Sequence, residues 1–86
     1  MKKQTLILKT QIELSTHRVK VLKSFEGMYN LRPKQIAELT GMNINYVSKS
    51  LGQLRNMDLV QVIESKGRAR YYGLTANGKH ILDYLD

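Results

Sequence analysis

The chain has 86 residues, enough for one small domain that buries roughly 60–65% of the surface of its unfolded chain. It carries 14 lysines and arginines against 7 acidic residues, and the resulting charge of +7 favours a polyanionic partner, nucleic acid first, or else a solvated cationic face. The absence of cysteine excludes disulfides, cysteine-based metal sites and thiol chemistry, and no apolar run suits a membrane helix or a signal peptide. A cytoplasmic location is expected.

Residues 1–14 begin with basic side chains and then alternate apolar and polar positions. Period two is typical of a strand or an extended arm, although Ile7, Gln11 and Leu14 would also share one face of a helix. An apolar arm on so small a domain is either a contact between two copies of the chain or an edge strand packed on its own domain.

The next stretch, STHRVKVLKSFEG, predicts a helix that starts after Ser15 or Thr16 as N-cap and stops at Gly27. His17, in the first turn, is expected to be polar surface. The inner positions are expected at Val19, Leu22 and Phe25. The outward basic positions, which touch phosphates or merely solvate the helix, are Arg18, Lys20 and Lys23.

Two short helices joined by a tight turn are predicted over residues 33–56. Pro33 suits the first position of a helix, Gly41 suits its left-handed end, and Asn43 suits the N-cap of the second helix. Gly52 lies inside that second helix, where glycine costs roughly 1 kcal/mol relative to alanine. It marks either the close approach of another backbone or partner, or plain tolerance.

Two β-branched runs, residues 59–64 and 70–74, predict a hairpin whose turn spans residues 65–69. Gly67 would supply the turn conformation, and the tip is cationic. Leu31 can add one strand-like residue before the helix pair. Thr75 then caps a last helix over residues 76 to about 85. The apolar positions expected to form the core are Val19, Leu22, Phe25, Ile36, Leu39, Val47, Leu51, Leu54, Val60, Val62, Leu74 and Ile81.

This order of elements resembles the winged helix-turn-helix family, and most closely the small prokaryotic or archaeal regulators of the MarR and ArsR groups. The resemblance rests on STHRVKVLKSF, on KQIAELTGMNINYVSKSLGQL and on NMDLVQVIESKGRARYYGLTANGKHIL. The last segment is the most specific, because it pairs LV before the hairpin with YYGLTANGKHIL after it. One departure is Asp58, which stands where such sequences commonly have glycine.

The resemblance implies an α+β fold, mainly α, in a single domain over residues 1–86. That fold has a three-helix core, a two- or three-stranded β-wing, a C-terminal helix and an N-terminal strand or arm. Its recognition helix, residues 43–56, would lie in the major groove. The wing, residues 65–70, would follow the DNA backbone or enter the minor groove.

The residues expected to read bases are Asn45, Tyr46, Lys49 and Gln53. Those expected to contact the DNA backbone are Asn43, Ser48, Ser50, Arg32 and Lys34. The wing contacts are expected from Lys66, Gly67, Arg68 and Arg70.

The function implied is a sequence-specific regulator of transcription that binds double-stranded DNA as a homodimer and associates with the nucleoid. Two alternatives stay open: a winged-helix adaptor that binds other proteins, and nonspecific binding to nucleic acid. No cofactor, metal, membrane or small-molecule ligand is expected. An enzyme is not expected either, because His17 and His80 stand in separate helices without a partner motif and no glycine-rich phosphate loop is present.

Overall fold

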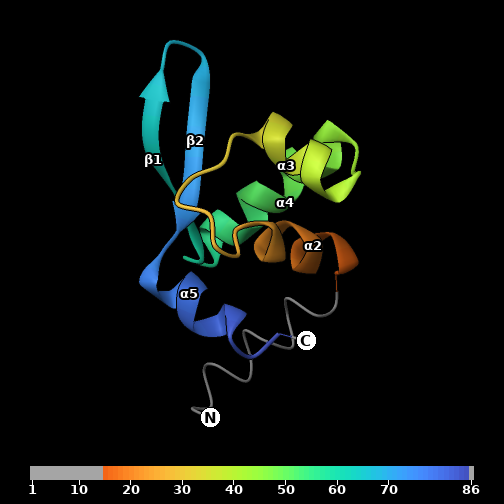
Figure 1. Ribbon diagram of the computed structural model, residues 1–86, viewed down its shortest axis with the longest axis vertical. Helices are drawn as coiled ribbons and strands as arrows, with labels where there is room; N and C mark the ends of the chain where they lie inside the picture. The colour runs from red at the N-terminus through yellow and green to blue at the C-terminus, as the bar shows by residue number, and fades with distance from the viewer. Residues whose placement is uncertain (1–14, 86) are drawn as a thin grey trace.

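The computed structural model describes residues 15–85, so the arm predicted over residues 1–14 lies outside the described part (Figure 1). The order of elements is α2 (Thr16–Ser24), α3 (Pro33–Thr40), α4 (Ile44–Asn56), β1 (Val60–Lys66), β2 (Ala69–Leu74) and α5 (Ala76–Leu82). The helices pack together, and the β1–β2 hairpin projects away from them at one end of the molecule (Figure 1).

The start of α2 and both ends of α3 follow the local chemistry that the sequence predicts, whereas α2 ends at Ser24, three residues before the stop predicted at Gly27. The side chain of Ser15 accepts a hydrogen bond from the backbone N–H of Arg18 at 3.3 Å and so caps α2. Pro33 occupies the first turn of α3, and Gly41 closes that helix with a φ of 72°, a left-handed conformation that glycine adopts without strain.

A single apolar cluster joins the helices and the base of the hairpin. Ile36, Val47 and Leu54 are fully buried in it. Its fully buried members are Val21, Leu22, Phe25, Leu31, Ile36, Val47, Leu51, Leu54, Leu59, Val60 and Ile81.

The prediction that Leu39 belongs to the core is wrong, because 57% of its surface is exposed. The face of α3 that turns inward runs through Ile36 and the half-buried Thr40, whose hydroxyl donates to the Ile36 carbonyl oxygen at 2.7 Å. Leu39 therefore lies to one side of that face. The other predicted core positions that are only half-buried are Val19, Val62 and Leu74.

The hairpin is longer than the sequence predicts. Lys66 pairs with Ala69, so the connection shrinks from five residues to the two residues Gly67 and Arg68. Gly67 has a φ of 57°, as a tight hairpin turn requires at that position. Leu31 and Tyr72 exchange two backbone hydrogen bonds of 2.8 Å, which confirms the prediction that Leu31 adds one strand-like residue.

The last helix is shorter than predicted and ends at Leu82. Its N-cap is Thr75, whose hydroxyl accepts from the backbone N–H of Gly78 at 3.0 Å. The backbone N–H of Thr75 also donates to the Leu59 carbonyl oxygen at 3.1 Å, which ties the start of α5 to the segment that follows α4.

Candidate nucleic-acid interface

One face of α4 is apolar and buried, and the opposite face is polar and exposed. Asn43 caps the helix by accepting from the backbone N–H of Asn45 at 2.8 Å. Positions spaced by three or four residues share a face of a helix. The exposed face runs through Asn45, Lys49, Gly52 and Asn56, and α4 contains no acidic residue.

Asn45, Ser48 and Lys49 are exposed on α4, as their predicted contacts with DNA require. Ser50 is the exception, since only 3% of it is exposed and it lies in the buried face with Val47. Ser50 is therefore not accessible for the contact with the DNA backbone that the sequence predicts.

Tyr46 and Gln53, the other two residues expected to read bases, lie on the flank of α4 that faces α2. The ring of Tyr46 stacks on that of His17, with centroids 4.7 Å apart and planes inclined by 29°. The side-chain oxygen of Gln53 accepts from Nε of Arg18 at 2.9 Å. Of the four residues expected to read bases, two thus lie on the outer face of α4, Asn45 and Lys49, and the other two contact α2.

The sequence interpretation missed His17 and Arg18 as partners of α4. It placed Arg18 with Lys20 on the outward face of α2, whereas Arg18 contacts Gln53. The signal was present in the spacing, because Arg18, Val21 and Leu22 stand at positions i, i+3 and i+4, and the latter two are fully buried.

At the start of α3, Arg32 and Lys34 are exposed. The guanidinium carbon of Arg32 lies 5.9 Å from the centre of the Tyr71 ring in β2, within the range of a cation–π contact. This contact holds a positive charge between the start of α3 and the middle of the hairpin.

The tip of the hairpin is exposed and basic. Lys66 forms an ion pair with Glu64 at 3.4 Å, and both side chains are open to solvent, with 72% and 44% of their surfaces exposed. An ion pair so exposed contributes little to stability. Arg68 and Arg70 are exposed beside it, so the hairpin brings basic groups together as the sequence predicts.

Asp58 links the exit of α4 to α5. It has a φ of 59°, a left-handed conformation that glycine adopts without strain. Its carboxylate accepts from the side-chain amide of Asn77 at 2.9 Å, and its backbone oxygen accepts from the Thr75 hydroxyl at 2.6 Å. Aspartate therefore makes a left-handed turn here, and its carboxylate adds a hydrogen bond that glycine could not supply.

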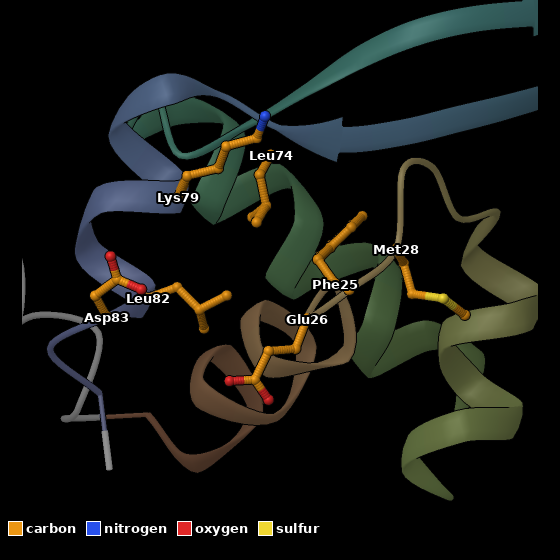
Figure 2. Close-up of a pocket in the computed structure, with 8 residues that line it drawn as sticks. Phe25, Glu26, Met28, Leu74, Lys79, Leu82 and Asp83 are labelled. Carbon is orange, nitrogen blue, oxygen red and sulfur yellow. The ribbon is translucent and has the colours of Figure 1, made fainter.

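A shallow, open hollow of about 430 Å³ lies apart from α4, between the loop that follows α2 and the helix α5 (Figure 2). Phe25, Leu74 and Leu82 give it apolar walls, while Glu26, Lys79 and Asp83 add charges at its sides (Figure 2). No residue of α4 or of the basic hairpin tip lines it, so it is separate from the polar face described above.

Over residues 15–85, no helix is long and apolar enough to cross a membrane. In the same part of the chain, no three histidine, cysteine or carboxylate side chains gather where they could hold a metal ion. His17 contacts Tyr46, and His80 meets Tyr84 edge to face at 5.2 Å.

Solved structures of MarR regulators share this fold. A mutant of MarR from E. coli complexed with operator DNA has a TM-score of 0.77 and 15% identity, over 96% of this chain and 61% of that one. A transcriptional regulator of the MarR family from Silicibacter pomeroyi has a TM-score of 0.79 and 21% identity, over 95% and 56%. FabT from Streptococcus pneumoniae in complex with DNA has a TM-score of 0.73 and 18% identity, over 81% and 50%.

The chain thus spans between half and about three fifths of the length of these structures. Its sequence matches no protein-family model and no curated protein. The comparison confirms the predicted fold class, a mainly α winged helix with a β-wing, and the likeness to the MarR group. At such low identity the shared feature is the fold.

Proposed function

We propose that this protein regulates transcription by binding specific double-stranded DNA, with α4 in the major groove and the β1–β2 hairpin on the backbone. The observation that carries the proposal is the exposed polar face of α4, free of acidic residues and backed by a buried apolar face. An α-helix fits the major groove, where amide and ammonium side chains distinguish the base pairs.

Asn45 and Lys49 are the base-reading side chains that this placement favours most, because both are exposed on the outer face of α4. Asparagine can pair with adenine through two hydrogen bonds, and lysine can donate to guanine O6 and N7. Ser48 and Asn43 stay in the proposal as backbone contacts beside them. Gln53 and Tyr46 also remain proposed base-reading residues, on the flank of α4 next to α2.

The basic groups outside α4 would position the protein on the duplex. Arg68 and Arg70 on the hairpin, with Lys66 and the turn residue Gly67, would follow the backbone or reach the minor groove. Arg32 and Lys34 would contact phosphates at the start of α3. Such contacts supply affinity that falls with salt and carries no sequence information directly.

We further propose that the protein acts as a homodimer in the cytoplasm, associated with the nucleoid. Helix-turn-helix dimers read two half-sites about one helical turn apart, so a pseudo-palindromic site is expected. Light scattering on the free protein and on its complex with DNA tests this. If only one copy of the chain binds the selected DNA, the proposed dimer and its pseudo-palindromic site are wrong.

Selection of bound duplexes from a random pool tests the proposed function itself. A DNA-reading regulator enriches a common motif, whereas a nonspecific binder retains duplexes of unrelated sequence. A protein that retains no duplex in dilute salt would instead favour the adaptor that binds other proteins.

A further inference from the structure

Two contacts join the first turn of α2 to one flank of α4, and neither belongs to the apolar core. Nε of Arg18 donates to the side-chain oxygen of Gln53 at 2.9 Å, across 35 positions of the chain. Two turns further toward the N-terminus of α4, His17 stacks on Tyr46. Both α4 residues are among those proposed to contact DNA.

The chemistry of arginine decides which way the Gln53 amide is turned. A guanidinium group only donates hydrogen bonds, so the group of Gln53 that faces Arg18 has to be the carbonyl oxygen. The NH₂ group of Gln53 is then the part left to meet another molecule. A free glutamine would read adenine by using both groups at once, the oxygen on N6 and the NH₂ on N7.

We propose that Arg18 sets the base preference of Gln53, so that this glutamine favours guanine over adenine. The inference rests on the proposed function. Guanine presents two acceptors, O6 and N7, to the major groove, and an amide that offers only its donors matches them. Adenine presents a donor at N6, which would have to share the Gln53 carbonyl oxygen with Nε of Arg18. Arg18 is a positioning residue, because it acts through Gln53.

The stack of His17 on Tyr46 supports this assignment, because it restrains the same flank of α4. A side chain already held in one orientation loses less freedom when it binds. The first turn of α2 therefore arranges this flank before DNA arrives, while Asn45 and Lys49 on the outer face are exposed.

The experiment compares Arg18→Ala with Lys20→Ala, which removes the same charge from an exposed position on the same helix. The probes are a duplex selected by the unaltered protein and a series in which each G·C pair is changed to A·T. Lys20→Ala should lower the affinity for every duplex by the same factor. Arg18→Ala should in addition reduce the discrimination against A·T at one position by about fivefold or more.

Two Gln53 variants show whether Arg18 acts through this residue. In a Gln53→Ala background, Arg18→Ala should behave as Lys20→Ala does. Gln53→Glu keeps an acceptor for Arg18 and removes the NH₂ donors, so it should abolish the preference for guanine at that position while the protein stays folded by circular dichroism.

The outcomes separate this inference from the function on which it rests. If the unaltered protein selects no motif, the proposed function falls, and this inference falls with it. If it selects a motif but Arg18→Ala and Lys20→Ala change the base preferences alike, only the role of Arg18 is overturned. The role of Arg18 would also be overturned if the unaltered protein prefers adenine at the position where Gln53→Ala weakens the base preference.

Discussion

Gly78 of α5 packs directly against the carbonyl oxygen of Leu59, and a Cβ atom on residue 78 would overlap that oxygen. Leu59 is fully buried just after α4, and its carbonyl also accepts from the backbone N–H of Thr75. The absence of a side chain at Gly78 thus lets α5 dock on the segment that follows α4.

Gly78→Ala should destabilise the protein by about 3 kcal/mol or more, because the new methyl group meets backbone and cannot be accommodated by a rotamer change. Urea unfolding followed by circular dichroism measures the loss. A variant as stable as the parent would mean that α5 does not sit as close to Leu59 as described.

Gly52→Ala is the control for Gly78→Ala, because it makes the same replacement in another helix but is expected to raise stability. Nothing lies within 4 Å of a Cβ at position 52, so alanine should stabilise the free protein by about 1 kcal/mol through its helix propensity. Gly52 is also on the exposed face with Lys49 and Asn56. If that face enters the groove, the same variant should bind the selected DNA more weakly, and unchanged binding would indicate that Gly52 is only tolerated.

Asp58→Gly should give a protein more stable than Asp58→Ala by about 1 kcal/mol. Both variants lose the hydrogen bond to Asn77, but alanine retains a Cβ in the left-handed conformation at a φ of 59°. Thermal unfolding of the two variants, with Asn77→Ala alongside, measures the difference. Equal stabilities would argue that residue 58 relaxes to another conformation when its carboxylate is gone.

Arg68→Ala should weaken binding to all duplexes by a similar factor and reduce the slope of log affinity against log salt by about 1. The control is Lys79→Ala, an exposed cation on α5 that lies outside α4 and the hairpin, and it should leave the slope unchanged. A loss of base preference in Arg68→Ala with the slope intact would contradict the wing assignment.

Local signals in the sequence predicted most of this fold. Pro33, Gly41 and Asn43 act within a few residues of themselves, and the helix boundaries that they set agree with the structure. The prediction that Leu39 is buried rested on spacing alone, and it is wrong. Which side of a short helix turns inward depends on the neighbouring helices, and the sequence of α3 does not specify them.

The candidate site was predicted less completely. The sequence identifies polar residues on α4, but their division into an outer pair and a pair beside α2 arises from packing between elements far apart in the chain. The contact of Arg18 with Gln53 is such a case. The burial of Ser50 is different, because Ser50 stands three residues after Val47 and four before Leu54, so helical spacing alone places it on the apolar face.

The central claim is that α4 reads sequence, and competition binding tests it most directly. The protein, bound to a labelled duplex selected from the random pool, is challenged with the same duplex unlabelled and with a scrambled one at about 0.15 M salt. The account predicts that the selected duplex competes at least 1,000-fold better, roughly the lower limit for specific complexes. It also predicts that Asn45→Ala and Lys49→Ala each lower the ratio by which the selected duplex competes better than the scrambled one. Equal competition by the two duplexes would contradict the claim.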